Sequence, residues 1–277
     1  MWIAKDDGKK RPRGKPCFED KLVQRAGVML VEAIFEHDFD ECSHGFRKGH
    51  SPHHARDELR AKCRQLNSNG RVEAAVSGFF DHLDWGPLRE FRPQRVNDGG
   101  ILRLIGKWLH AGVLEAGELT HPDKGTPQGG VVSPMGSHIF LHQVLDDWCV
   151  KDVQPRRKGR CFGMRLADDC IIGGELEADA HRVMAVVPKR CNRFSLTMHP
   201  AKTGLIAFKR PPRRDHSAGG KGSFDLLGCT HSWAKTRRGY WVIKRKTGRK
   251  RRRRCMKERG TWCRENRHEP WQEPSRT

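Results

Sequence analysis

The stretch "RLADDCIIGG", Arg165–Gly174, places two adjacent carboxylates, Asp168 and Asp169, between two short apolar runs. This pattern predicts a strand, a tight turn that carries the acids, and a second strand. Two acids at a hairpin tip form either an ordinary solvated turn or part of a site for a cation such as Mg²⁺. Two-metal phosphoryl transfer needs carboxylates from separate elements. The pair therefore raises the question of whether a second acidic position lies elsewhere on the sheet.

A glycine-rich loop, "GTPQGGVVSP" from Gly125 to Pro134, lies about forty residues before the acidic pair. Its glycines allow a ligand to approach the backbone closely, and Gln128 offers both donors and an acceptor. Further upstream, a predicted strand over residues 71–76 runs into the segment "GFFD". These segments together predict a site assembled from several elements.

The composition is strongly basic, with 54 Lys and Arg against 33 Asp and Glu, and a formal net charge of +21. Such an excess predicts attraction to polyanions, with nucleic acid as the first candidate and an anionic membrane surface as a weaker one. The sequence contains neither an apolar run long enough to span a membrane nor the apolar core of a secretory signal. Its ten scattered cysteines, without a C-x-x-C pair, indicate reduced thiols and a cytoplasmic protein.

The order of predicted elements favours an α+β fold with helices packed on an antiparallel sheet. Apolar side chains from Leu22 to Ile34 recur at the spacing of an amphipathic helix. We predict further helices over residues 52–66, 101–113, 133–149 and 177–196, and strands over 71–76, 161–174, 224–233 and 240–245. Pro188 is expected to kink or break the 177–196 helix. Nine of the eleven residues from Lys244 to Arg254 are basic, which predicts a solvated tail or a phosphate-binding arm.

Eight segments occur in an order that resembles a known family. Between residue 3 and about residue 250, the chain is similar to the reverse transcriptase part of bacterial group II intron-encoded proteins, the reverse transcriptase/maturases. The segments are "AKDDGKKRPRGKP", "EDKLVQRA", "CSHGFRKGHS", "GFFDHLD", "GTPQGGVVSP", "RLADDCIIG", "LTMHPAKT" and "FDLLGCTH".

The resemblance implies a right-hand polymerase with fingers and palm, in which helices pack on an antiparallel palm sheet. Residues 1–70 would form a fingers-like part, residues 71–235 a palm-like core with fingers insertions, and residues 236–277 a basic tail at the start of a thumb/maturase region. We expect this chain to be truncated at both ends relative to the family. The implied activity is RNA-directed DNA synthesis with Mg²⁺ in the bacterial cytoplasm. The implied partners are an RNA template, a DNA primer, deoxynucleoside triphosphates and a group II intron RNA.

The resemblance also implies roles for individual residues. Asp168 and Asp169 would be the catalytic, metal-binding pair. Nucleotide-binding positions would be Lys5, Arg11, Phe80, Gln128 and Lys202. Nucleic-acid-binding positions would be Leu227 and Gly228, which match the turn that supports the primer end, and the basic residues Lys244, Arg245, Lys246, Arg249, Lys250 and Arg251.

The chain departs from the family pattern at its other metal ligand. The family's palm strand carries an Asp where this sequence has Ala75, and the residue before Ala167 is Leu166 instead of an aromatic. Glu73 lies two residues earlier, which displaces it by roughly 6.6 Å along a strand. We therefore expect impaired catalysis by this polymerase. The alternative is a non-catalytic, RNA-binding maturase-like module or a decayed fragment.

Two further groups of side chains have competing interpretations. His138 and His142 have the i, i+4 spacing of a metal-binding pair, but they lack the glutamate of H-E-x-x-H, so we interpret them as one face of a helix. Trp233 and Trp241, which lie among basic residues, are either core residues or platforms for base stacking.

Overall fold

The computed structural model describes residues 2–4, 10–12, 14–66, 70–76, 79, 96–109, 111–115, 118–120, 129–200, 202–212 and 222–268. For residues 2–4, 10–12, 70–75, 109, 113–115 and 118–120 the description covers the backbone alone. The chain divides into two compact units, residues 1–209 and 210–277, and each is described by itself. The predicted boundary at residue 236 falls within a hairpin of the second unit, whereas the division between fingers and palm stays a prediction.

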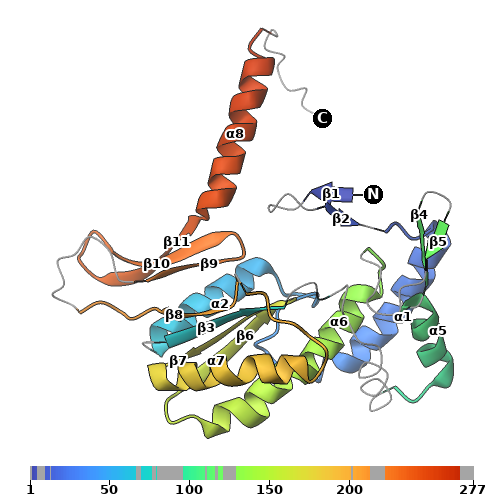
Figure 1. The fold of residues 1–277 in the computed structure, drawn as a ribbon, viewed down its shortest axis with the longest axis horizontal. Coiled ribbons are helices and arrows are strands. Elements are labelled where there is room, and N and C mark those ends of the chain that lie inside the picture. Colours follow the sequence, from blue (N-terminus) through green and yellow to red (C-terminus); the bar gives the residue numbers. More distant parts are fainter. Residues whose placement is uncertain are drawn as a thin grey trace. The chain divides into compact units, whose positions relative to one another are not determined.

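A four-stranded antiparallel sheet forms the centre of the first unit (Figure 1). Its strand order is β6 (Cys161–Leu166), β7 (Asp169–Gly174), β3 (Gly70–Ala75) and β8 (Gly204–Ala207). Four consecutive residues of β6 and five of β7 are buried, because both faces of these strands are covered. In the register of the two central strands, Ala75 is paired with Asp169.

Helices cover this sheet and join it to a second helical layer. Helix α2 (Pro52–Gln65) contacts β6, and α7 (Glu177–Asn192) contacts β3, β7 and β8. Ser51 begins α2 as predicted, since its Oγ accepts a hydrogen bond from the backbone of His54. Helix α7 continues through Pro188, contrary to the expected break, and its buried Val183, Val187 and Cys191 hold it against the core.

The polar network described below lies on a helix that changes its hydrogen-bonding pattern. Helix α6 (Ser133–Leu141) runs directly into π-helical turns at His142–Asp146 and Cys149–Val153, followed by a 3₁₀ turn at Gln154–Arg156. Eight of the nine residues of α6 are buried, so it is a core helix. π-Helical turns are rare and occur mostly at functional sites.

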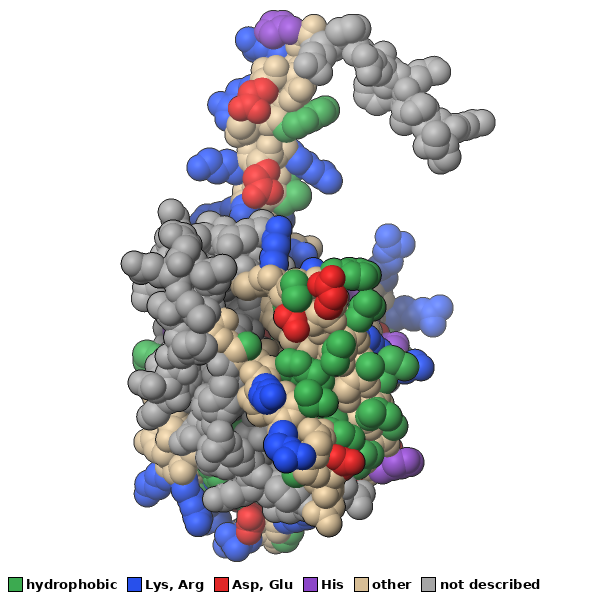
Figure 2. All heavy atoms as spheres, turned by 90° about the vertical axis from the view of Figure 1, so that its right-hand side faces the viewer, with side chains coloured by type: hydrophobic (Ala, Val, Ile, Leu, Met, Phe, Trp, Pro, Cys, Tyr) green, Lys and Arg blue, Asp and Glu red, His purple; other side chains and the backbone are tan. Residues whose placement is uncertain are grey.

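The predicted apolar pattern on the first helix points away from the core. Helix α1 (Phe18–Phe35) buries Val28, Val31 and Phe35 against α5 and α6. The side chains that define the sequence pattern are instead exposed, and Figure 2 shows hydrophobic side chains gathered on this face. The large exposed side chains on α1 are Phe18, Leu22, Val23, Met29, Leu30 and Ile34.

The helix predicted over residues 101–113 differs from the prediction at both ends. Helix α5 (Gly99–Leu109) begins earlier than expected because Asp98 accepts hydrogen bonds from the backbones of Gly100 and Ile101. It also ends earlier, and the chain continues into the short hairpin of β4 (Val113–Glu115) and β5 (Glu118–Thr120).

A short hairpin of β1 (Trp2–Ala4) and β2 (Lys10–Pro12) lies at the start of the chain. None of the helices within the described ranges is long and apolar enough to cross a membrane.

The second unit is a three-stranded antiparallel sheet followed by a helix. The single strand predicted over residues 224–233 is two strands, β9 (Ser223–Leu226) and β10 (Cys229–Lys235), whereas β11 (Trp241–Thr247) corresponds to the strand predicted over 240–245. Trp233 and Trp241 are only 2% and 5% exposed, so the interpretation of these rings as base-stacking platforms is wrong, and they are core residues. Part of the predicted basic tail forms helix α8 (Arg249–Glu265), which has no buried residue, because Arg and Lys are good helix formers.

Two methionines on helices provide a direct test of this core. Met135 on α6 is 5% exposed, and Met29 on α1 is 57% exposed. We expect Met135→Ala to lower the free energy of unfolding by about 2–5 kcal/mol. We expect Met29→Ala to change it by no more than about 0.5 kcal/mol. Urea unfolding followed by circular dichroism measures both, and equal losses would show that the α1 face is in fact covered.

Candidate active site

The acidic pair lies at the tip of the β6–β7 hairpin. Leu166 is paired with Asp169, so Ala167 and Asp168 form a two-residue turn between them. Ala167 has a φ of 54°, in the left-handed region that non-glycine residues seldom adopt. The backbone carbonyl of Asp168 accepts a 3.3 Å hydrogen bond from Val76, at the end of β3. The turn is thus strained and tied to the central strand, as is common where a chain positions functional groups.

The loop after α1 supports this tip from the open edge of the sheet. Arg165 donates its backbone N–H to Cys42, and its carbonyl accepts a hydrogen bond from His44, both at 2.9 Å. Gly45 follows directly, and a Cβ at that position would overlap the backbone nitrogen of Ala167. Only glycine therefore allows the loop to pack against the turn at this distance.

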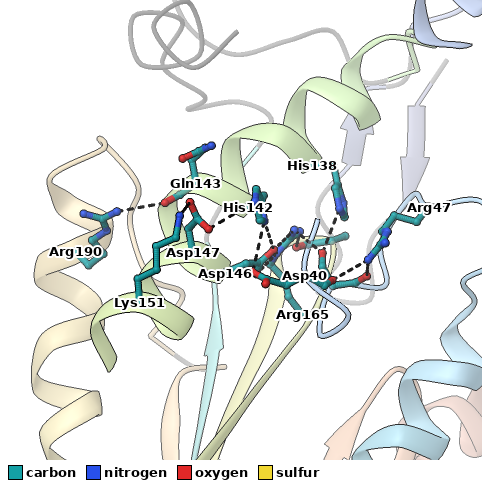
Figure 3. A network of polar contacts seen from close by, with 12 residues as sticks. Asp40, Arg47, His138, His142, Gln143, Asp146, Asp147, Lys151, Arg165 and Arg190 are labelled. Atoms are coloured by element: carbon teal, nitrogen blue, oxygen red, sulfur yellow. Dashed lines mark hydrogen bonds and ion pairs between the residues drawn. The ribbon is translucent and has the colours of Figure 1, made fainter. Parts of the chain in front are cut away.

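A buried ion pair holds the same turn from inside. The guanidinium of Arg165 and the carboxylate of Asp146 are 1% and 3% exposed. Arg165 donates from Nε at 2.8 Å and from Nη2 at 2.6 Å to the two oxygens of Asp146 (Figure 3). Its Nη1 donates to the carbonyl of Ala167 at 3.1 Å, and Nη2 also donates to Ser43 Oγ at 2.6 Å. Arg165 therefore joins the turn, the loop and the π-helical stretch.

The charge on Asp146 follows from this pairing. Burial by itself raises the pKa of the Asp146 carboxyl, but the positive charge and the hydrogen bonds of Arg165 outweigh burial and hold that pKa at about 2. The carboxylate is consequently ionised at neutral pH. A buried pair of this kind contributes mainly geometry, because desolvation of both ions offsets much of their attraction.

The two histidines of the "HIFLH" segment have different surroundings. His138 Nε2 lies 3.2 Å from Ser43 Oγ, and its ring packs edge-on against Phe39. Burial and the nearby charge of Arg165 lower the pKa of His138 to about 2, so it is neutral. His142 faces Asp40 and Asp146 instead. This agrees with the interpretation of the two residues as a helix face and not as a joint metal site.

The acids at the tip lie near a small pocket, the charge of Lys202 and Ala75 at the end of β3. Asp168 borders a small pocket that Phe46, Phe79 and Leu141 also line. Burial raises the pKa of Asp169, Asp168 raises it further, and the positive charge of Lys202 lowers it. Lys202 is exposed, and its charge acts on the tip, where the resemblance places a nucleotide-binding residue. On the opposite strand, the residue paired with Asp169 is Ala75, which has no ligand atom.

The remaining predicted nucleotide-binding residues stay predictions. Lys5, Phe80 and Gln128 lie outside the described residues. Arg11 lies in β2, whose backbone alone is described, and is paired there with Ile3.

The predicted nucleic-acid-binding residues lie together in the second unit. Leu227 and Gly228 form the two-residue turn between β9 and β10, with φ values of 52° and 75°. The guanidinium of Arg251 lies against Gly228, where a Cβ would come within 2.8 Å of its Nη1. The remaining residues of this group are exposed on β11 and α8: Lys244, Arg245, Lys246, Arg249 and Lys250.

Sequence reasoning did not identify Arg165, Asp146, Ser43 and Gly45 as parts of the site. One signal was available for Arg165, since a single charged residue in the strand "CFGMRL" departs from its apolar character. A charge buried in a strand requires a partner, but the sequence does not indicate which acid provides it.

The buried ion pair has a measurable consequence for stability. We expect Arg165→Met to lower the free energy of unfolding by about 3–5 kcal/mol, because Asp146 is left buried without its partner. The double variant Arg165→Met/Asp146→Leu should recover part of that loss, since no uncompensated charge remains. Arg160→Met is the matched control, because Arg160 forms a 2.6 Å pair with Glu175 at the surface just before β6, and we expect little change. Urea unfolding of all three variants measures this, and equal effects of Arg165→Met and Arg160→Met would contradict the assigned role.

Comparisons with known proteins agree with the arrangement of the hairpin, the loop and the central strand. Residues 3–231 match the reverse transcriptase (RNA-dependent DNA polymerase) family. Over 146 residues, 52% of the chain, it is 35% identical to Protein YkfC of Escherichia coli (strain K12) and 39% identical to the group II intron-encoded protein LtrA of Lactococcus lactis subsp. cremoris. These matches span 38% and 24% of the two relatives.

A solved structure has the same fold. The apo telomerase from Candida tropicalis aligns with a TM-score of 0.55 and 11% identity, over 76% of this chain and 39% of that one. This identity is low, so the likeness concerns the fold alone. Because the family match extends from residue 3 to residue 231 and includes every strand of the sheet that carries the acidic tip, this chain belongs to the reverse transcriptase family.

Proposed function

We propose that this chain is an RNA-directed DNA polymerase module of the group II intron type whose nucleotidyl transfer is impaired at position 75. The observation that carries the proposal is the β3–β7 register, in which Ala75 is paired with Asp169. The supports of the tip, Arg165 and Gly45, are in place. The frame for catalysis is thus present, whereas one ligand position is an alanine.

The donor set at the tip explains the proposed impairment. Polymerases that use two metal ions draw carboxylates from more than one element. Asp168 and Asp169 come from one hairpin, and the residue paired with Asp169 contributes no oxygen from its side chain. Ala75 and Asp169 do not together complete a two-Mg²⁺ site. We therefore assign no step of the reaction of the wild-type chain to a metal ion.

The proposed partners follow from the family and from the charge of the chain. They are an RNA template, a DNA primer, deoxynucleoside triphosphates and a group II intron RNA in a bacterial cytoplasm. The support is the net charge of +21 and the similarity to a group II intron-encoded protein.

Restoring the carboxylate tests the proposal. We expect Ala75→Asp to raise the rate of primer extension on an RNA template at least about a thousandfold, because a metal ligand contributes several kcal/mol and each 1.36 kcal/mol is tenfold in rate. Adding Asp168→Asn to that variant should abolish the gain. Single-turnover extension with Mg²⁺ measures the rates.

A neighbouring position provides the matched control. Ala74 is paired with Cys170, and successive residues of a strand point to opposite faces, so Ala74→Asp should give no gain in extension. Circular dichroism establishes that each variant is folded. Equal extension by the wild type and Ala75→Asp would contradict the proposed impairment.

A second candidate function is RNA binding without polymerisation, and α8 favours it. None of the residues of this helix is buried, and residues 249–254 are six consecutive basic residues at its N-terminal end. Cations at a helix N-terminus oppose the helix dipole, so this arrangement does not serve the stability of the helix. It suits the neutralisation of phosphates, with affinity that depends on counterion release.

The salt dependence of RNA binding tests this candidate. We expect Arg249→Gln/Lys250→Gln to weaken binding to structured RNA and to reduce the slope of log K against log salt by about two, one for each phosphate contact removed. The exposed pair Arg237→Gln/Arg238→Gln removes equal charge from the β10–β11 turn and is the control. Filter binding at several salt concentrations measures the slopes, and equal changes in both variants would show that α8 has no special role.

A further inference from the structure

A cluster of three metal-ligating side chains lies behind the tip, outside the polymerase site. One nitrogen of His142 and one carboxylate oxygen of each of Asp40 and Asp147 lie within 4.8 Å of one another. Asp40 comes from the loop after α1, whereas His142 and Asp147 lie at the start and just after the end of the first π-helical stretch. Figure 3 shows these side chains turned toward one another.

The central side chain of this cluster is buried with an unsatisfied nitrogen. His142 is 3% exposed, and its Nδ1 lies 3.9 Å from Asp40 Oδ2 and 3.6 Å from Asp146 Oδ2. Both distances are too long for hydrogen bonds, and Nδ1 has no hydrogen-bond partner within the described part of the chain. Buried polar atoms in native proteins are nearly always satisfied, so an orphaned imidazole nitrogen points to a missing ligand.

The second ligand is also unsatisfied. The Oδ2 atom of Asp40 is buried, and no described residue forms a hydrogen bond with it. Asp147 contributes a second carboxylate oxygen within 4.8 Å of a carboxylate oxygen of Asp40. A cation between them would pair with both carboxylates.

The nearby cations are committed elsewhere. Arg165 forms its bidentate pair with Asp146, and Lys151 lies 2.8 Å from Asp147 Oδ2. This leaves Asp147 Oδ1, which lies 3.8 Å from the other ring nitrogen of His142, Nε2, while its Nδ1 faces Asp40. Arg47 donates to the backbone carbonyl of Asp40 and to Glu36, not to the carboxylate of Asp40.

We propose that Asp40, His142 and Asp147 bind one divalent transition-metal ion, of the Mn²⁺ or Zn²⁺ class. An imidazole nitrogen favours such ions over Mg²⁺, and the two carboxylates suit Mn²⁺. Bonds of about 2.0–2.2 Å would draw the three donor atoms together by roughly 1 Å. Asp40 and Asp147 are 30% and 23% exposed, which leaves a route for the ion and room for water ligands.

Such an ion would connect the loop after α1 to the π-helical stretch. That loop also carries Gly45, which packs against the acidic turn. An ion bound to Asp40 would therefore hold this loop in place beside the turn. The proposed site gives the two histidines of "HIFLH" different roles. His142 is a ligand together with two acids, while His138 remains with Ser43.

Electron spin echo spectroscopy of bound Mn²⁺ tests the proposal on the intact chain. Mn²⁺ held by Asp40, His142 and Asp147 should show ¹⁴N modulation from a directly coordinated imidazole. Mn²⁺ at Asp168 and Asp169 has only carboxylate oxygens and water as ligands and should show none. We expect the ¹⁴N signal in the wild type and in Asp168→Asn, and its loss in His142→Gln.

A conservative pair of variants provides the affinity measurement. Asp147→Asn keeps the size of a partly exposed side chain, and we expect it to weaken this Mn²⁺ site at least about tenfold. Asp152→Asn is matched to it, because Asp152 forms the same kind of i, i+4 pair, at 3.2 Å with Arg156, and we expect no change. Titration of free Mn²⁺ by electron paramagnetic resonance gives the affinities, and circular dichroism confirms folding.

The surface histidines His53 and His54 are the competing source of nitrogen ligands. If the ¹⁴N signal survives His142→Gln and disappears in His53→Ala/His54→Ala, the proposal is overturned. It is also overturned if wild-type Mn²⁺ shows no nitrogen coordination, or if Asp147→Asn and Asp152→Asn bind Mn²⁺ equally.

Discussion

The buried contact between Arg165 and Asp146 is the interaction on which the rest of the site depends. Arg165 reaches the acidic turn through Ala167, the loop through Ser43 and the π-helical stretch through Asp146. Three segments that are distant in the sequence thereby meet at one guanidinium. Apolar side chains would often serve stability equally well, but they would not specify this geometry, because only the planar fork of arginine directs several hydrogen bonds at once.

The same frame explains how the fold persists with an alanine at position 75. The register of β3 depends on backbone pairing with β7 and β8, and an alanine at position 75 leaves that pairing intact. Gly45 and Arg165 shape the turn from its other sides. The side chain at position 75 can consequently vary without disturbing the parts that position Asp168 and Asp169, since those parts rely on other contacts.

The second unit shows a different balance between folding and binding. Its sheet has its own core, in which Trp233, Trp241 and Phe224 are buried. Helix α8 has no buried residue, so tertiary packing contributes little to it, and its like charges repel one another. A polyanion bound along the helix would reduce that repulsion.

The sequence by itself determined the elements whose signals are local. The β6–β7 hairpin followed from two apolar runs around a short acidic turn, and the start of α2 followed from Ser51 and its proline. The comparison of "AVSGFFD" with the family pattern also singled out Ala75, and the strand register pairs this residue with Asp169. Each of these signals lies within a few residues, where turn chemistry and capping act.

Only the tertiary structure decided which side chains share a buried environment. The apolar pattern of α1 predicted a helix, but it did not indicate that Val28 and Val31 face the core while Met29 and Leu30 face outward. Likewise, no sequence spacing connects Asp40 with His142. Periodicity reports the spacing of side chains along one element. Burial and charge pairing depend on which other element packs against it, and this packing is settled only when the whole chain has folded.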